Sequence, residues 1–250
     1  MAELFHKTFS DALTGANGFD SVAAANGTIV HSAGAGLNGT SGGVTITKTV
    51  PGTNHSIYGT MASDFSAATV ARAAWWTDLS ALTIGTNNQG TLLFRCWNGT
   101  NSLLLVAAVL VAGVVNLRGY LYNDGGSNTN QSVALVPLDW IEVRVQRASD
   151  GATADGNLRI YCGGGDYAAL GELVLEIPNI LCYTVFSNVT TSLLGMPPLL
   201  VSLSVGGSIV IDEFTMRDDD TPILFGVSES TRSLGMQYVL NRRRRKSYCW

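Results

Sequence analysis

The segment from Trp140 to Arg147 reads Trp-Ile-Glu-Val-Arg-Val-Gln-Arg and alternates between apolar and polar side chains. A period of two is typical of a β-strand, in which successive side chains point to opposite faces of the sheet. We therefore expect one face of this strand to be buried and the other to lie in water. The expected buried residues are Ile141, Val143 and Val145, and the expected solvated residues are Glu142, Arg144 and Gln146.

The segment that follows has the same pattern. Asp150-Gly151 and Asp155-Gly156 indicate a loop that reverses the chain, and Leu158, Ile160 and Cys162 then resume the alternation. The sequence therefore predicts an antiparallel pair of strands here.

Upstream, further β-rich segments are separated by turns. A threonine-rich strand is expected at Val44–Val50, and Thr91–Trp97 is a strand closed by the turn signal Asn98–Asn101. The apolar block Leu103–Leu117 has the length of a buried helix, but its valines and Gly113 favour one or two buried strands. Its longest apolar run is shorter than the roughly 20 residues of a membrane-spanning helix, so we expect core and no membrane span.

Other segments give weaker predictions. Asp64–Trp76 is either a short helix or a strand, and Asn123–Ser132 is expected to be a polar loop. Late in the chain, alternation at Val201–Val205 is followed by a tight turn at Gly206-Gly207 and a returning strand at Ser208–Arg217. The alternation fails at Asp212-Glu213, where a β-bulge would restore it.

The composition supports an all-β protein. Charged residues make up 14% of the chain, against about 25% in typical soluble domains, and there are 28 glycines. These values exclude a coiled coil, a long-helix bundle and a disordered acidic chain. Many short strands with polar, glycine-rich turns predict an antiparallel two-sheet sandwich of the jelly-roll type. Four cysteines are too few for a disulfide scaffold, and three of them lie in β-like runs as small buried side chains: Cys96, Cys162 and Cys182.

The net charge of −4 is unevenly distributed. Residues 1–241 contain 10 Lys and Arg against 19 Asp and Glu, a net charge of −9, whereas Arg242–Lys246 contribute +5. Such a tail can bind an acidic protein surface, nucleic acid or an anionic membrane, or it can be a solvated terminus. Residues 1–7 have neither the positive region nor the apolar region of a secretion signal, so we expect none.

Several segments together resemble the concanavalin A-like (laminin G-like) jelly-roll domains. They are the β-rich pair around Trp97 and Leu103, Leu138–Val145, Asn157–Tyr161 and the closing strand Ile209–Phe214. Phe9-Ser10-Asp11 and Phe19-Asp20 loosely match the opening of such domains. The resemblance covers about residues 5 to 217 and implies a concanavalin A-like sandwich.

Some proteins of this fold are glycoside hydrolases with paired acids in a Glu-x-Asp-x-x-Glu pattern, which does not occur here. Glu172 and Glu176 are separated by an apolar run, and Asp212 and Glu213 would point to opposite faces of a regular strand. We interpret both pairs as solvated side chains and expect no catalytic residues.

Metal and cofactor sites are not expected either. The three histidines are far apart, there is no zinc motif or phosphate-binding loop, and Asp218–Asp220 is interpreted as a solvated turn. Calcium binding, known in similar domains, would use loop carboxylates, but no ligand pattern distinguishes the candidates Asp124, Asp150, Asp155 and Asp166.

Lectin-like jelly rolls bind sugars by stacking aromatic rings on them and by satisfying hydroxyl groups with Asn and Asp. The resemblance implies a carbohydrate site whose candidate residues are Trp75, Trp76, Trp97, Asn98 and Asn101. The alternative is that strand tryptophans such as Trp97 and Trp140 anchor the core between the two sheets.

The division expected is a jelly-roll domain at residues 1–220 and a C-terminal docking arm at 221–250. Pro222 breaks the preceding strand, and the apolar pieces of the arm are too short to fold alone. The arm is expected to contact the body, another copy or another protein through an aromatic and basic set: Phe225, Tyr238, Arg242, Arg243, Arg244, Arg245, Lys246 and Trp250.

These observations predict a non-enzymatic structural or interaction protein. The leading hypothesis is a virion component, such as a phage capsid decoration or tail protein, that forms a homo-oligomer and contacts other virion proteins. The few charges, the absence of a catalytic pattern and the basic arm support it, as do only three lysines among 15 cations. The alternative is a lectin-like module that binds a surface glycan, and a glycoside hydrolase ranks third.

Overall fold

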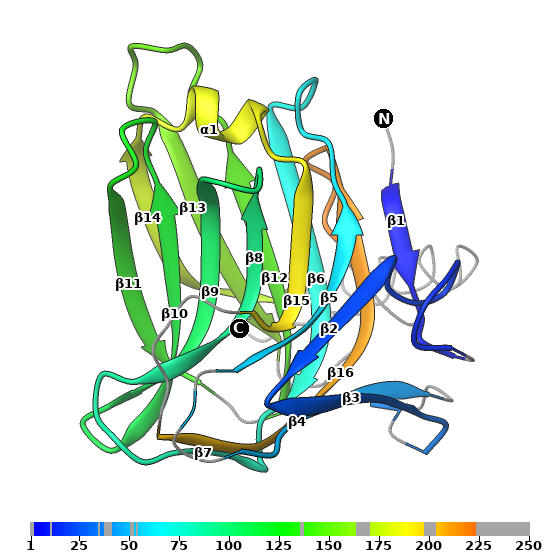
Figure 1. Cartoon of the computed structure of the whole chain (residues 1–250). Helices are drawn as coiled ribbons and strands as arrows, with labels where there is room; N and C mark the ends of the chain where they lie inside the picture. Colours follow the sequence, from blue (N-terminus) through cyan, green and yellow to red (C-terminus); the bar gives the residue numbers. More distant parts are fainter. Residues whose placement is uncertain are drawn as a thin grey trace, which may run out of the picture.

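A computed structural model describes residues 3–10, 12–34, 36–37, 42–50, 53, 55–135, 138–163, 171–197 and 204–223. They form two antiparallel β-sheets that pack face to face, with the short helix α1 (Tyr183–Ser187) at one end (Figure 1). The two-sheet antiparallel sandwich expected from the sequence is confirmed. Within these ranges no helix has the length and apolar character needed to cross a membrane.

The first sheet, called here the nine-stranded sheet, has seven strands in one hydrogen-bonded path, and two further strands, β1 and β7, pair with β16. Along the path its strands are β14 (Glu172–Ile180), β13 (Gly156–Gly163), β12 (Leu138–Gln146), β6 (Val70–Asp78), β16 (Val205–Arg217), β4 (Gly43–Lys48) and β3 (Gly27–Ser32), and the two additions are β1 (Glu3–Lys7) and β7 (Leu82–Ile84).

The second sheet, called here the seven-stranded sheet, is built largely from the middle of the chain. In order, its strands are β11 (Asn128–Ala134), β10 (Val114–Tyr122), β9 (Ser102–Val111), β8 (Gly90–Trp97), β15 (Thr191–Met196), β5 (Ser56–Ala62) and β2 (Ser21–Ala25).

The core lies between the sheets and is joined by aromatic rings. Trp75 of β6 packs on Phe94 of β8, with ring centroids 5.1 Å apart, and Phe214 of β16 lies 5.6 Å from Phe94. Ile141, Val143 and Val145 point into this core as the alternation predicts, and all three are buried. Burial of these apolar side chains is the main term that stabilises the sandwich.

Two open assignments are settled by the strand pairing. The apolar block after Asn101 forms the hairpin β9–β10, in which Val111 pairs with Val114 across a two-residue turn. Both turn residues, Ala112 and Gly113, have positive φ, as a tight hairpin turn of this length requires. The stretch Asp64–Trp76 contains no helix; its second half is strand β6.

The sequence prediction of a polar loop at 123–132 is wrong in its second half. Residues from Asn128 onward form the edge strand β11, which pairs with β10 from Tyr122–Asn128 to Asn116–Ala134. The strand is mostly exposed and polar. Pairing with a stable neighbour therefore overrides the low strand propensity of Asn and Gln.

The predicted turn at Gly206-Gly207 is also wrong. Both glycines lie inside β16 and pair with Thr83 and Leu82 of the short strand β7. Gly207 has a φ of +80°, and a Cβ atom there would overlap the carbonyl oxygen of Ala81. Gly207 thus allows close backbone approach rather than chain reversal. The predicted strand residues 201–203 lie outside the described residues.

The expected β-bulge at Asp212-Glu213 is present. The register of β16 against β6 shifts between Asp212 and Phe214, and Glu213 has a φ of +43°. However, the interpretation of both carboxylates as solvated is wrong, because Asp212 and Glu213 are buried. Asp212 Oδ2 accepts a hydrogen bond of 2.9 Å from the backbone N–H of Leu37, which lies over it, whereas Glu213 Oε2 has no partner among the described residues.

Burial and the neighbouring Asp212 carboxylate raise the pKa of Glu213 to about 7, from an ordinary value of 4.5. The stability contributed by the protonated carboxyl is therefore complete below pH 4.5 and lost as the pH rises through 7. We expect Glu213→Gln to raise the free energy of unfolding at pH 8 by roughly 2 kcal/mol and to change it little at pH 4, as measured by urea denaturation.

Glu176→Gln is the matched control, since Glu176 is partly exposed and paired with Arg159 at 2.7 Å. It should cost no more than about 1 kcal/mol at pH 8. An equal effect of Glu213→Gln at both pH values would contradict the assignment of a buried, unpaired carboxylate.

Candidate functional site

The five residues expected from the sequence to bind sugar do not form one site. Trp75 is fully buried between the sheets, where it packs on Phe94, and has no exposed ring face. Trp76 points to the opposite side of β6 and is 3% exposed, in a cluster with Trp140 and Ile223. Neither ring offers a surface to a sugar. The alternative left open by the sequence, that Trp97 and Trp140 anchor the core between the sheets, is wrong, because Trp140 lies in the outer cluster with Trp76 and Trp97 is partly exposed.

Trp97, Asn98 and Asn101 do lie together, at the end of β8 and in the turn to β9. Asn98 is committed to the turn, because its Oδ1 accepts hydrogen bonds from the backbone N–H groups of Thr100 and Asn101 at 3.0 and 2.7 Å. Trp97 is partly exposed and Asn101 is exposed. This end of β8 is the part of the predicted site that remains accessible.

The position of Trp97 follows from strand alternation. Phe94 and Cys96 of β8 point into the core, so Arg95 and Trp97 point to the outer face of the seven-stranded sheet. The guanidinium of Arg95 lies over the indole of Trp97, 3.9 Å from the ring centroid. Stacking of this kind is a cation–π contact, which partly stabilises the charge of the arginine.

Arg95 is a buried cation without an acidic partner among the described residues. It is 5% exposed, and the hydrogen bond that it makes runs from Nε to Ser102 Oγ at 3.0 Å. Burial lowers the pKa of Arg95, and the nearby phenol groups of Tyr122 and Tyr58 oppose that shift. Sequence reasoning missed this residue; the signal was a single charge within the otherwise apolar strand TLLFRCW.

A buried apolar cluster, with two partly buried tyrosines packed against it, lies beside the pair. Leu92, Leu105, Ala107 and Val109 form a cluster of their own, separate from the main core, with Tyr120 and Tyr122 of β10 packed against it. Tyr120 lies opposite Leu105, the residue that also pairs with Arg95. We define the Arg95 site as Arg95, Trp97, Ser102, Tyr58 and Tyr122.

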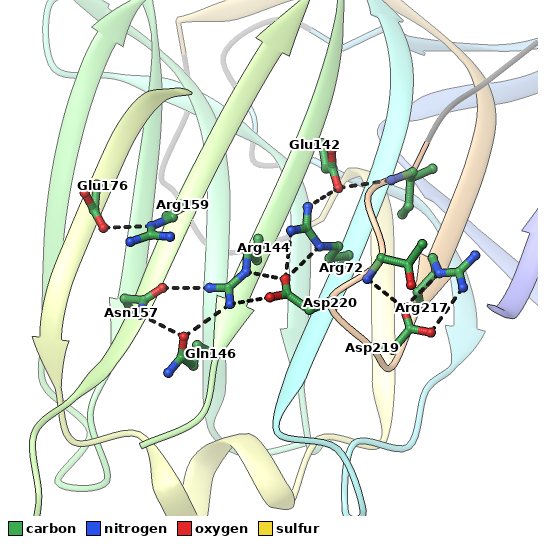
Figure 2. A network of polar contacts seen from close by, with 12 residues as sticks. Arg72, Glu142, Arg144, Gln146, Asn157, Arg159, Glu176, Arg217, Asp219 and Asp220 are labelled. Atoms are coloured by element: carbon green, nitrogen blue, oxygen red, sulfur yellow. Dashed lines mark hydrogen bonds and ion pairs between the residues drawn. The ribbon is translucent and has the colours of Figure 1, made fainter. Parts of the chain in front are cut away.

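The outer face of the nine-stranded sheet is different, because its arginines are paired. Arg72 Nη1 donates to Glu142 Oε1 at 2.6 Å, and both Arg72 and Arg144 donate to the carboxylate of Asp220 (Figure 2). Arg144 binds Asp220 through two nitrogens, at 2.6 and 3.0 Å. Gln146 and Asn157 complete the network around Arg144.

This network corrects two expectations from the sequence. Glu142 and Arg144 were predicted to lie in water, but they are 1% and 6% exposed, because Asp220 to Ile223 turn back over this face. Asp218–Asp220 forms the expected turn, yet Asp219 and Asp220 pair with arginines rather than being simply solvated. Salt-bridge partners hold the pKa values of these two carboxyls near 2.

The described residues offer little to covalent or metal chemistry. Burial raises the pKa of Cys96 to about 12, and burial with the charge of Lys48 lowers that of His55 to about 4, so a protonated thiol and a neutral imidazole prevail at pH 7. Glu172 and Glu176 lie on β14, Glu172 exposed and Glu176 paired with Arg159. Within the described ranges no three His, Cys, Asp or Glu side chains are grouped as metal ligands.

The residues proposed for the C-terminal contact, from Phe225 to Trp250, all lie outside the described residues, as does most of the expected arm. Ile223 is buried against Ala74, Trp76 and Trp140. The described chain is thus anchored on the nine-stranded sheet up to this residue, and the expected boundary between domain and arm stays a prediction.

No protein-family model matches this chain, and no curated protein is significantly similar to it in sequence. Among solved structures it is similar to the cellulose-induced protein Cip1, with 10% identity and a TM-score of 0.56 over 88% of this chain and 99% of that one. It is also similar to a carbohydrate esterase of the Shiga toxin-encoding bacteriophage phi24B, with 13% identity, a TM-score of 0.51 and the same coverage of both chains. At these identities the likeness shows a shared all-β sandwich fold, consistent with a jelly roll.

We expect replacement of a paired and of an unpaired arginine to change stability by different amounts. Arg72→Met leaves the Glu142 carboxylate buried without its cation, so we expect the free energy of unfolding to fall by about 3 kcal/mol or more. Arg95→Met removes a buried charge that has no carboxylate partner among the described residues, and we expect a change of less than about 1 kcal/mol. Urea unfolding at pH 7 measures both. A loss for Arg95→Met as large as that for Arg72→Met would identify Arg95 as a structural residue.

Proposed function

We propose that this chain is a non-enzymatic saccharide-binding module with a concanavalin A-like jelly roll, which binds its ligand at the Arg95 site. The observation that carries the proposal is the stacked pair of Arg95 and Trp97 on the outer face of the seven-stranded sheet. An indole that is partly exposed offers an apolar surface to the C–H groups of a pyranose ring. A guanidinium beside it supplies several N–H donors for the oxygens of the same sugar.

Two further observations bear on the proposal. The strands of the seven-stranded sheet contain no Asp or Glu, so a pair of carboxyl groups that could cleave a glycosidic bond is absent from them. The two structural neighbours named above are, by their own names, a carbohydrate esterase and a protein induced by cellulose, which agrees with a saccharide ligand but shows only the fold.

A second proposal concerns assembly. The ion pairs of Asp220 and the buried side chain of Ile223 hold residues 220–223 on the nine-stranded sheet. The chain beyond them contains the basic segment Arg242–Lys246. We propose that the module belongs to a virion, as a capsid decoration or tail protein, and that residues 224–250 contact other copies, virion proteins with acidic surfaces or nucleic acid.

The saccharide proposal predicts that Trp97→Ala lowers affinity for the bound glycan at least about tenfold, because the stacking surface is lost. A glycan array identifies the ligand, and titration calorimetry gives the affinity. Trp76→Ala is the matched control, since Trp76 lies on the far sheet, and it should leave affinity unchanged when the protein is folded. Equal binding by wild type and Trp97→Ala would exclude this site.

The assembly proposal predicts a difference in native mass between the full chain and a chain that ends at Ile223. Ending the chain there, rather than before Asp220, keeps the arginine network intact. We expect the full chain to form a defined oligomer and the shortened chain to be monomeric, by light scattering coupled to gel filtration. Thermal melting checks that both are folded. Monomers in both cases would contradict an assembly role for the arm.

A further inference from the structure

We infer that the ligand of the Arg95 site is an acidic saccharide, whose carboxylate or sulfate group pairs with the Arg95 guanidinium. The inference rests on the proposed saccharide function and specifies the chemical class of the ligand.

The first argument is the charge of the sheet. The seven strands of the seven-stranded sheet contain two arginines, Arg95 and Arg118, and no Lys, Asp or Glu. By contrast, residues 1–241 as a whole carry a net charge of −9. A positive face on an acidic body attracts anionic ligands, and the attraction acts over about 10 Å in 0.1 M salt.

The second argument is the missing partner. Buried charges in proteins are normally paired, and this protein follows that rule on its other sheet, where Glu142 and Asp220 neutralise Arg72 and Arg144. Arg95 is buried to the same degree, yet the contacts shown for it are a serine hydroxyl and the face of an indole. An anionic group on the ligand would supply the counter-charge that the described part of the chain does not.

A second unsatisfied donor lies beside the guanidinium. Nε1 of Trp97 is buried and has no hydrogen-bond acceptor among the described residues. The indoles of Trp75 and Trp140 also lack acceptors there, so this feature alone does not identify a site. Trp97 differs because Arg95 stacks on its ring and because part of its side chain is exposed. Carboxylate and sulfate groups have several acceptor oxygens and can engage such neighbouring donors.

The sparse charge of the face favours a saccharide over nucleic acid. A nucleic acid carries one phosphate for each nucleotide, and proteins bind it through grooves lined with many Lys and Arg side chains. The seven-stranded sheet has two arginines and no lysine, on a body that would repel a dense polyanion. An acidic sugar with one anionic group at Arg95 and neutral rings along Trp97 and the tyrosines fits this distribution better.

The test compares ligands that differ only in charge. A neutral oligosaccharide that carries one galacturonate is paired with its methyl ester, and a singly sulfated oligosaccharide with its unsulfated form, so that carboxylate and sulfate are tested separately and each acidic ligand has one charge. We expect the full chain to bind at least one acidic member about tenfold or more tightly than its neutral counterpart, by calorimetry at 0.1 M NaCl.

Variants assign the preference to one residue. Arg95→Gln keeps hydrogen-bond donors but removes the charge, so it should bring the acidic-to-neutral affinity ratio close to one. Arg118→Gln is the matched control, since Arg118 is the other arginine of the sheet and donates to Ser132 Oγ. It should lower the ratio much less than Arg95→Gln does, because Arg118 adds to the positive charge of the face but its charge is partly exposed and screened by salt.

Each other outcome overturns something specific. Equal affinity for acidic and neutral partners, with loss of both in Trp97→Ala, would overturn the acidic ligand and leave the saccharide function standing. Binding to none of these oligosaccharides and to nothing on the glycan array would overturn the proposed function. Tighter binding of a single-stranded oligonucleotide, with the same dependence on Arg95, would identify nucleic acid as the ligand and overturn the inference.

Discussion

The packing of Trp75 against Phe94 and Phe214 is the contact on which the arrangement of this protein depends. These rings come from β6, β8 and β16 and therefore join both sheets through one point. Because side chains alternate along a strand, fixing Trp75 and Phe94 inward also fixes what points outward: Trp76 beside the first and Arg95 beside the second. The arginine network and the Arg95 site therefore lie on the outer faces of the two sheets.

The two outer faces handle charge in different ways. On the nine-stranded sheet, each buried arginine shown in Figure 2 meets a carboxylate of the same chain, and the result is a closed, self-neutralising network. On the seven-stranded sheet, Arg95 rests on an aromatic ring without a described acid beside it. An unpaired buried charge is unfavourable for folding, and such local costs are typical of sites that serve a ligand. This difference between the faces is the basis on which we propose a binding role for Arg95 and a structural role for the paired arginines.

Local patterning predicted the parts of the fold that depend on neighbouring residues. Alternation at Trp140–Arg147 placed the core residues of β12, and the broken parity at Asp212-Glu213 indicated the bulge. Local patterns did not predict contacts between segments far apart in the sequence, since none of them shows that Asp220 and Ile223 cover Glu142 and Arg144. The candidate site was predicted only at Trp97, because the importance of Arg95 lies in a missing partner, which becomes visible only when the surrounding strands are in place.

The ion pairs that Asp220 forms with Arg72 and Arg144 affect how the domain responds to force. Asp220 lies three residues beyond the end of β16, and its two partners are on β6 and β12, two adjacent strands of the same sheet. Tension applied to the chain beyond Ile223 would load these ion pairs before it could peel β16 from β6. The force would be distributed over β6 and β12, and the hydrogen bonds between β16 and β6 would not break one after another. We therefore expect a force applied beyond Ile223 to leave the β-sheet folded as long as these ion pairs hold.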